Sequence, residues 1–387
     1  MEPKSICIVS SQYLPHVGGV ENYVNNLSRE LASRGHRVTI LTSEMEGVPD
    51  YEQREGIEIY RLPTRQFMGG RFPVLKHNRA LRQFTKQFRT RHFDVMLVNM
   101  RFYFISLYAV RLAKKMGVRC IMLDHGSSHL NTGGKLTTKL SEWFEHGITF
   151  LEKRYCKEFA GVSKASLEWI RHFGIRSELL LTNAVDLEAF KTYCEHPVCS
   201  FREQYGIPKG DILIAFVGRL TVEKGIHHLT SVVKRIYQDR HDVWLLAAGN
   251  GYLLEKLEAD KSPTTHFVGQ IGTDRVAALL QESDIFCLPS FSEGFPTCVI
   301  EAGVCRSFVI TTYQGDAKEI VLNREYGIIL PDNAQEGLYR AITEVLDLPE
   351  YRQRATELCY DRIVENYTWK HTADRFLALL EDPEQRE

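Results

Sequence analysis

Two acidic residues bracket a short segment that could bind an anion together with a diol. Glu293 and Glu301 stand near the two ends of the run EGFPTCVIEA, which follows an apolar segment at residues 285–290 that predicts a buried parallel strand. Pro296 is placed where a helix can begin, because the first helical residue needs no N–H partner. The N–H groups of a first helical turn favour an anion such as a phosphate. Carboxylates only accept hydrogen bonds, so they suit the hydroxyl groups of a sugar or ribose, although an ordinary loop with exposed acids is the alternative.

A second group of polar residues follows residues 212–218, which the sequence predicts to be another strand. Arg219 and Lys224 come just after the C-terminal end of this strand, where ligands bind in open α/β sheets. Two cations in this place suit a diphosphate, although either residue alone could be a solvated loop side chain. Two further short strands end in glycine-containing segments, which contain Gly249 with Gly251, and Gly269 with Ile271. Four strand ends with anion and diol chemistry therefore occur within one stretch of the chain.

Taken together, these motifs resemble glycosyltransferase family 4, the retaining, sugar-nucleotide-dependent enzymes of the GT-B fold. In the C-terminal half the resemblance rests on Gly218-Arg219-Leu220 with Glu223-Lys224-Gly225, on Gly249-x-Gly251, on Phe267-x-Gly269, and on the acidic pair Glu293 and Glu301. In the N-terminal half it rests on Gly18-Gly19-Val20-Glu21, Asp124-His125-Gly126 and Asn183-x-Val185-Asp186. The resemblance covers nearly the whole chain, and the motifs of the C-terminal half are the more specific ones.

The length and the pattern of the chain predict two α/β domains. At 387 residues the chain is too long for one typical core. Its predicted strands alternate with helical patterns, which favours parallel sheets with helices on both faces. We expect an N-terminal domain over residues 1–185, a linker over 186–205 and a C-terminal domain over 206–368. The resemblance implies two Rossmann-like doubly wound domains facing across a cleft, with a helix at 369–387 that crosses back to the first domain.

The resemblance also assigns roles to the C-terminal residues. The donor would be a nucleoside-diphosphate sugar, with UDP favoured over GDP, bound mainly by the C-terminal domain. Arg219 and Lys224 would clamp its diphosphate, Glu301 would hold the ribose diol, and Glu293 would hold hydroxyls of the transferred sugar. The segment expected to add backbone N–H groups to the diphosphate consists of Gly294, Phe295, Pro296 and Thr297.

The N-terminal domain would bind the acceptor. His125 follows a predicted strand, and the resemblance implies that it contacts the transferred sugar from across the cleft. Asp124 could orient the His125 ring or simply end the strand. Gly18 and Gly19 would let the backbone approach a phosphate or sugar closely, or could equally form a turn. Retention without an evident enzymic nucleophile suggests attack on the same face as the leaving group, helped by the leaving phosphate.

The sequence contains no Asp-x-Asp triplet and no His or Cys cluster with metal-ligand spacing. We therefore expect no metal and no other cofactor, with Arg219, Lys224 and a helix N-terminus neutralising the leaving diphosphate instead. Two other classes stay open at this point. One is a sugar-nucleotide epimerase or phosphorylase of the same architecture, and the other is a catalytically silent sugar-nucleotide-binding protein.

Charge is unevenly distributed in a chain whose formal net charge is only −1. Residues 54–119 contain 15 Lys and Arg but three Asp and Glu, with the centre at residues 75–91. A helical pattern there places Leu81, Phe84 and Phe88 on one side, and the adjoining face contains Arg79, Arg82, Lys86 and Arg89. A basic amphipathic helix is typical of contact with an anionic membrane surface. The alternative is a solvated helix whose apolar side packs on its own sheet, and no nucleic-acid motif accompanies the basic residues.

The remaining features favour a cytoplasmic enzyme. The nine cysteines include no Cys-x-x-Cys pair, which suits a reducing compartment. A strand is predicted almost at once, at residues 6–10, so we expect no signal peptide. The acceptor would be a glycan or a lipid-linked glycan of bacterial surface-polysaccharide or glycoconjugate synthesis. Peripheral contact of the enzyme with the inner face of the cell membrane is the alternative to a purely cytoplasmic location.

Overall fold

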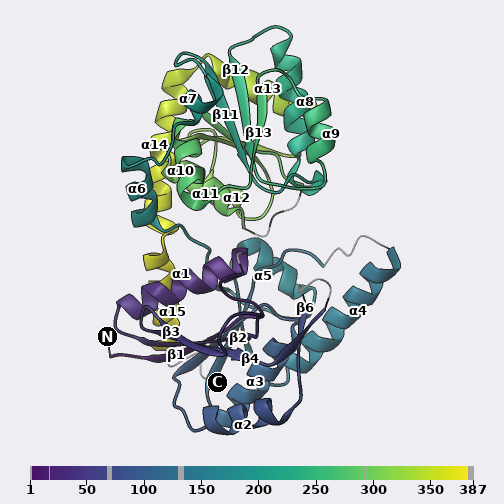
Figure 1. Ribbon diagram of the computed structural model, residues 1–387, viewed down its shortest axis with the longest axis vertical. Helices are drawn as coiled ribbons and strands as arrows, with labels where there is room; N and C mark the ends of the chain where they lie inside the picture. Colours follow the sequence, from purple (N-terminus) through teal and green to yellow (C-terminus); the bar gives the residue numbers. More distant parts are fainter. Residues whose placement is uncertain are drawn as a thin grey trace. The chain divides into compact units, whose positions relative to one another are not determined.

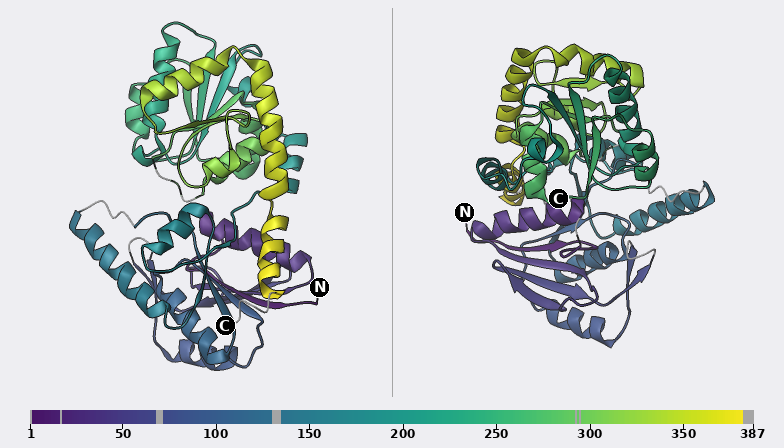
Figure 2. Two further views of the ribbon diagram at one scale, coloured as in Figure 1. Left: turned by 180° about the vertical axis from the view of Figure 1, so that it is seen from behind. Right: turned by 45° about the horizontal axis from the view of Figure 1, so that its top comes forward.

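The computed structural model describes residues 2–16, 18–67, 72–129, 135–291, 293 and 295–381, with the backbone alone at 135–137. The chain forms two compact units. The first consists of Met1–Asn183 together with the C-terminal helix α15 (Trp369–Glu381), and the second consists of Ala184–Thr368. Each unit has a central, mainly parallel sheet with helices packed on it (Figures 1 and 2). The predicted fold class, two Rossmann-like α/β domains, is confirmed.

The first unit is built on an eight-stranded sheet with the order β10-β9-β8-β7-β1-β2-β4-β3. Its strands are β1 (Ser5–Val9), β2 (Arg37–Ser43), β3 (Tyr51–Arg54), β4 (Ile57–Leu62), β7 (Val95–Asn99), β8 (Arg119–Asp124), β9 (Glu158–Gly161) and β10 (Leu179–Leu180). All neighbours pair in parallel except β3, which runs antiparallel to β4. The chain order reverses between β1 and β7, and this switch point is where a sheet of this kind opens a crevice for ligands. The short strands β5 (Thr64–Phe67) and β6 (Phe72–Leu75) pair separately.

The helices of the first unit follow the sequence pattern closely. They are α1 (Gly19–Ser33), α2 (Arg79–Phe88), α3 (Phe104–Met116), α4 (Lys135–Glu152) and α5 (Lys164–Arg171), with α15 in addition. The helical spacing of the sequence selects Val20, Tyr23, Val24, Leu27 and Leu31 on α1; the last four are fully buried, and Val20 is half-buried. Helix α15 packs beside α1, and Thr372 Oγ1 donates a hydrogen bond to the carbonyl of Thr182 at 2.9 Å. The C-terminal segment is thus part of the first unit's core.

The apolar side of the basic helix α2 packs against its own unit. Leu81 and Phe88 are buried, and the Phe88 ring stacks on both Phe84 and Phe93 at 5.1 Å between ring centroids. The four cations of its other face are exposed to solvent: Arg79, Arg82, Lys86 and Arg89. The structure thus shows the alternative weighed from the sequence, in which the apolar side of the helix packs inward. Contact of α2 with a membrane would therefore involve its charged side chains only. Among the described helices, none is both long enough and apolar enough to cross a bilayer.

The second unit has a six-stranded, wholly parallel sheet with the order β13-β12-β11-β14-β15-β16. Its strands are β11 (Ile212–Val217), β12 (Val243–Ala248), β13 (Thr265–Gly269), β14 (Ile285–Leu288), β15 (Phe308–Thr312) and β16 (Ile328–Leu330). The chain builds outward from β11 to β13 and then returns to place β14 on the other side of β11. The switch point of this sheet therefore lies between β11 and β14.

Helices surround this second sheet. They are α6 (Leu187–Glu195), α7 (Phe201–Tyr205), the 3₁₀ turn η1 (Val222–Lys224), α8 (Ile226–Tyr237), α9 (Leu254–Ala259), α10 (Thr273–Glu282), α11 (Thr297–Val304), α12 (Ala317–Ile320), α13 (Gln335–Leu346) and α14 (Pro349–Asn366). The segment 186–205, which we expected to be a linker, contains α6 and α7. Asp186 and Ser200 cap these two helices, and Phe190 and Phe201 are buried in the core of the second unit. Two short helices anchored by single aromatic residues leave too little apolar periodicity to be read from sequence.

Candidate functional site

The switch point of the second unit brings together a lysine and a glutamate from two loops. Lys224 Nζ donates to Glu293 Oε1 at 2.6 Å, and Ser290 Oγ donates to the same oxygen at 2.7 Å. The exposed fraction is 18% for the Lys224 side chain and 9% for that of Glu293, so both charges are held largely away from solvent. Lys224 follows β11 and Glu293 follows β14. The sequence selected both residues as site residues but not their pairing.

A close backbone contact fixes this arrangement. Gly225 adopts φ +69°, and a Cβ built on it would overlap the carbonyl oxygen of Pro289. The same two loops are joined by a hydrogen bond from the N–H of Phe291 to the carbonyl of Glu223, at 2.8 Å. Only glycine combines the positive φ with such an approach. The loop that carries Lys224 is therefore pressed against the loop that carries Glu293.

The carboxyl ends of β11, β12 and β13 lie side by side next to this pair and are joined by backbone hydrogen bonds. Gly249 adopts φ +138° and leaves no room for a Cβ against the carbonyl oxygen of Gly218. The N–H of Gly249 donates to the carbonyl of Gly269 at 2.8 Å, and the N–H of Leu220 donates to the carbonyl of Asn250 at 2.9 Å. The glycine-rich strand ends selected from the sequence thus lie together at the carboxyl edge of the sheet, where Ile271 packs on the core.

Arg219 differs from Lys224 in having its charge available. Its side chain is exposed. Within the described part of the chain it forms no ion pair, whereas Lys224 is engaged by Glu293. A guanidinium group at a strand end can donate two parallel hydrogen bonds to a phosphate. The site therefore offers one free cation and one cation already neutralised by a carboxylate.

The start of α11 departs from expectation in one respect. Pro296 precedes the helix with φ −80° and ψ 85°, and the N–H of Thr297 donates to the carbonyl of Phe295 at 3.0 Å. These values are those of a tight inverse γ-turn. One N–H expected to face an anion is thus used within the turn. Phe295 packs on the core, and Gly294, which we also expected in the site, lies outside the described residues.

Glu301 lies on α11 and is only partly exposed. Burial raises the pKa of its carboxyl group from 4.5 to about 7. Among the residues that the structure describes, no cation pairs with Glu301, and a carboxylate buried in this way is costly to ionise. Hydrogen-bond donors brought by a ligand would favour the ionised form.

In the first unit, His125 is held as a neutral ring of defined tautomer. Asn99, the last residue of β7, donates from Nδ2 to the carbonyl of Val9 at 3.1 Å, which leaves its Oδ1 to face His125 Nε2 at 2.9 Å. Nε2 must therefore carry the proton, and Nδ1 keeps a lone pair. The Tyr23 ring meets the imidazole edge-on at 4.9 Å. Burial lowers the pKa of His125 to about 3, so the ring is uncharged at neutral pH.

A buried arginine that sequence reasoning missed organises the loops around His125. The Arg101 side chain is 1% exposed, and its Nε lies 2.6 Å from Oδ2 of Asp124. Asp124 also accepts a hydrogen bond from the N–H of Gly126 at 2.8 Å. Asp124 thus pairs with Arg101 and with its own loop, and neither of these bonds orients the His125 ring. Met100 and Phe102, on either side of Arg101, both have positive φ, 63° and 70°.

Non-glycine residues in that conformation are strained and concentrate at functional sites. Arg101 follows the end of β7 as closely as Arg219 follows the end of β11, and this position at a strand end is the signal that the sequence offered.

The glycines after β1 and the acid that follows them lie at the start of α1. Gly18 precedes the helix with extended backbone, and Gly19 is exposed. Glu21 is buried in the first turn, with its Oε1 3.2 Å from Nδ1 of His16. These residues stand next to the switch point of the first sheet.

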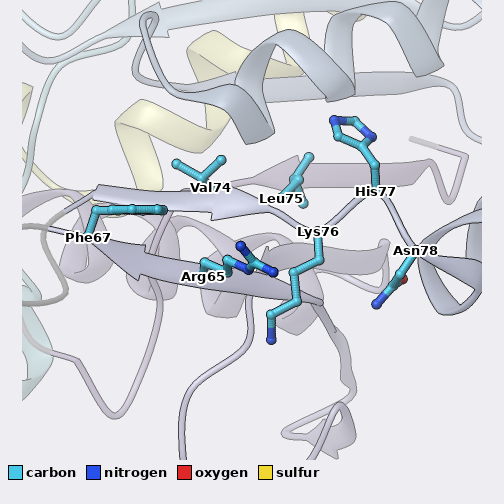
Figure 3. A pocket seen from close by; sticks show the side chains of 7 residues that line it. All are labelled: Arg65, Phe67, Val74, Leu75, Lys76, His77 and Asn78. Atoms are coloured by element: carbon cyan, nitrogen blue, oxygen red, sulfur yellow. The ribbon is translucent and has the colours of Figure 1, made fainter.

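A surface pocket of about 450 Å³ lies elsewhere, on the small β5–β6 sheet. Figure 3 shows its seven lining side chains, which are Arg65, Phe67, Val74, Leu75, Lys76, His77 and Asn78. None of them belongs to the predicted site. We give more weight to the two switch points than to this pocket, because ligands in open α/β sheets bind at switch points.

Comparison with known proteins gives two family matches and relatives of similar length. Residues 17–189 match the family described as Glycosyltransferase Family 4, and residues 200–362 match Glycosyl transferases group 1. The chain is 23% identical to an uncharacterized glycosyltransferase of Methanocaldococcus jannaschii, covering 98% of this chain and 99% of that protein. It is 24% identical to the GPI3 subunit of phosphatidylinositol N-acetylglucosaminyltransferase from Saccharomyces cerevisiae, covering 97% and 82%.

The fold is also found in solved structures. The Anabaena protein HepE, solved in complex with UDP and glucose, superimposes with a TM-score of 0.74 at 14% identity, covering 98% of this chain and 99% of that one. At this level of identity the likeness concerns the fold. Together with the two family matches, it accounts for both units of the chain.

The raised pKa of Glu301 gives a stability prediction. Between pH 4.5, where the unfolded carboxyl group titrates, and about 7, the folded state binds more protons than the unfolded state. The free energy of unfolding therefore falls as pH rises through this window, by about 3 kcal/mol for a shift of this size. Glu301→Gln removes the titration. The free energy of unfolding should be measured with urea at pH 5 and at pH 8. Relative to the wild type, the variant should be more stable at pH 8 than at pH 5, by a difference of this size. The same difference at both pH values would contradict the burial of a titrating carboxyl group.

Proposed function

Because the chain is a glycosyltransferase and belongs to family 4, we propose that it moves a hexose-type sugar from a nucleoside-diphosphate sugar to a hydroxyl of a glycan or lipid-linked acceptor, with retention. The observation that supports this best is the Lys224–Glu293 pair at the switch point of the second sheet. A cation for phosphate and an acceptor for hydroxyl groups, 2.6 Å apart, match the junction between the diphosphate and the sugar of such a donor.

The donor's diphosphate would be bound by Arg219 and Lys224. The exposed guanidinium of Arg219 is free to meet the phosphate charge, while Lys224 has three N–H donors and can keep Glu293 while donating to a phosphate oxygen. At the strand ends that contain Gly249 and Gly269, the nucleotide could lie close to the backbone because no side chain intervenes. Glu301 would accept the ribose hydroxyls, and UDP is favoured over GDP, as in the solved complex of HepE with UDP and glucose.

The proposed transfer is a single substitution at the anomeric carbon. The bond between this carbon and the diphosphate oxygen breaks, and the acceptor oxygen bonds to the carbon on the same face. The acceptor's proton passes to the leaving phosphate. Negative charge grows on the diphosphate as it leaves, and Arg219 and Lys224 are placed to stabilise it, which is the largest usual contribution of a site to such a step. In this proposal the two side chains supply the charge for which other enzymes use a metal ion.

Glu293 and His125 are assigned to the sugar. The carboxylate of Glu293 would accept sugar hydroxyls while neutralising Lys224, so that the ammonium group keeps its place when the site is empty. His125 would contact the transferred sugar, as the resemblance to the family implies. Since its ring is neutral with a lone pair on Nδ1, it can accept a hydrogen bond from a hydroxyl without adding charge.

The acceptor side would include contact with the surface of an anionic membrane. Helix α4 exposes a row of large apolar side chains, Leu140, Trp143 and Phe150, which are 72%, 81% and 64% exposed. Helix α2 exposes four cations. An apolar row and a basic face in one unit suit a lipid-linked acceptor, and the yeast relative is named for transfer to phosphatidylinositol. The enzyme would then act in the cytoplasm, at the inner face of the cell membrane, in surface-polysaccharide or glycoconjugate synthesis.

Removing the charge of either Arg219 or Lys224 should abolish most of the turnover. We expect Arg219→Ala and Lys224→Ala each to lower kcat by at least about a hundredfold, because one lost charge contact to a leaving group is worth roughly 3 kcal/mol. Lys224→Ala should be the more severe, since it also leaves Glu293 as an unpaired, largely buried carboxylate beside the phosphates. The measurement is release of nucleoside diphosphate from a panel of donors.

The matched control is Lys209→Ala, an exposed lysine of the same unit, which should retain full turnover. The assay should run in excess EDTA, since the proposed chemistry uses no metal. Near-normal rates in both Arg219→Ala and Lys224→Ala, or a strict requirement for added Mg²⁺ or Mn²⁺, would refute the proposed mechanism.

Membrane contact is tested by sedimentation with liposomes. At low salt the protein should sediment with anionic vesicles and dissociate as salt rises, because exposed charges are screened within about 8–10 Å near physiological ionic strength. Changing Arg79, Arg82, Lys86 and Arg89 to Gln should weaken this binding by up to about a thousandfold, at roughly 1 kcal/mol per cation. Binding of the donor to the second unit should not change. Equal binding of the wild type to neutral and anionic vesicles would show that α2 has no such role.

A further inference from the structure

Three histidines from three separate segments of the first unit converge on one point. His129 follows β8, His146 lies on α4, and His172 immediately follows α5. One ring nitrogen of each lies within 4.8 Å of the other two. The Nε2 atoms of His146 and His172 are 3.2 Å apart. The sequence could not reveal this group, because the three positions lack metal-ligand spacing and only the fold brings them together.

One of these rings is oriented by a buried carboxylate. Nδ1 of His129 lies 3.1 Å from Oε2 of Glu145, whose side chain is 1% exposed and which is also 3.5 Å from Arg101. An ionised carboxylate accepts hydrogen bonds only, so it holds the proton on Nδ1 and leaves the lone pair on Nε2. A histidine that binds a metal characteristically donates its other N–H to a carboxylate in this way.

The other two rings lie beside each other and are open to solvent. The Trp169 ring stacks on His172 with a 5.2 Å centroid distance and a 5° angle between the planes. His146 and His172 are exposed, so an ion can reach the group and a water molecule can complete its coordination.

We propose that His129, His146 and His172 bind one divalent transition-metal ion, with Zn²⁺ the best match. Zn²⁺ takes imidazole nitrogens at about 2.0–2.1 Å in tetrahedral geometry, which places them about 3.3 Å from one another. The Nε2 atoms of His146 and His172, 3.2 Å apart, already have this spacing, and a ring nitrogen of His129 lies within 4.8 Å of the other two ligand atoms. Cu²⁺ and Ni²⁺ also favour imidazole, so affinity alone would not exclude them.

This site is distinct from the proposed transfer chemistry. It shares no residue with the donor site of the second unit. Its proposed ligands come from α4, from the end of α5 and from the loop after β8. The same loop contains His125, which precedes His129 in the chain. The bound ion would have a structural role, because it would link the segment that ends at His129 to α4 and to the end of α5.

The test uses the full chain without a histidine tag, stripped with EDTA and dialysed. Calorimetric titration with ZnCl₂ should give one ion per chain. At a hundredfold excess over the dissociation constant, the midpoint of thermal unfolding should rise by about 5–10 °C. Substituting Co²⁺ should give the visible absorption of a tetrahedral nitrogen-ligated ion, which separates this site from a cysteine site.

The decisive variant is His146→Ala combined with His172→Ala. Both side chains are exposed, so the protein should fold as before while losing the bound ion, the thermal shift and the Co²⁺ absorption. His77→Ala, an exposed histidine of the same unit outside the group, should retain all three. Should the double variant fail to fold, His146→Ala alone serves, with at least a tenfold loss of affinity expected. Absence of Zn²⁺ binding by the wild type, or unchanged binding by the double variant, would overturn the proposal.

Discussion

The candidate donor site depends on the close approach of two backbone loops at the switch point of the second sheet. Gly225 has no side chain, and the loop after β11 can therefore touch the carbonyl of Pro289 in the loop after β14. This contact carries Lys224 to within 2.6 Å of Glu293. A buried ion pair of this kind adds little net stability, because both charges lose hydration, but it fixes position. The site thus has its charges in place before any ligand arrives, which reduces the reorganisation needed in the reaction.

In the first unit, too, contacts within the protein hold charged side chains in position, but the residues are different. Its switch point is lined by a loop in which Met100 and Phe102 adopt left-handed backbone around the buried Arg101. Arg101 neutralises Asp124, and Asp124 in turn holds the N–H of Gly126, next to His125. The strain of the loop is therefore balanced by a charge network that only the complete fold provides. His125 is held through Asn99 as a neutral ring, prepared for contact with an uncharged hydroxyl.

Local pattern predicted β1 in the first sheet and β11, β12, β13 and β14 in the second, with the residues at their carboxyl ends, because a buried parallel strand is a continuous apolar run whose end is marked by glycine or charge. The strands β3, β9, β10, β15 and β16 were not predicted. The features that were missed depend on contacts between distant segments. The pairing of Lys224 with Glu293, the burial of Arg101 and the convergence of His129, His146 and His172 have no local signature. The helices at 187–195 and 201–205 were missed because each is anchored by a single aromatic residue. For α2 the amphipathic pattern was correct, but it could not tell whether Leu81 and Phe88 face lipid or their own core.

In the proposed donor complex, a nucleoside diphosphate binds at the ends of β11 and β14, with its ribose on Glu301 and the sugar on Glu293. Calorimetric titration of UDP into the wild type, Glu301→Ala and Glu293→Ala tests this division directly, with the exposed Glu255→Ala as control. Loss of a charge-assisted hydrogen bond costs about 1.5–3 kcal/mol, so Glu301→Ala should weaken UDP binding by roughly 10- to 150-fold. Glu293→Ala should lose far less affinity for UDP, because its proposed partner is the absent sugar and the Lys224 ammonium group, released from the ion pair, is still available to the phosphates. Equal losses in both variants, or full affinity in Glu301→Ala, would contradict the account.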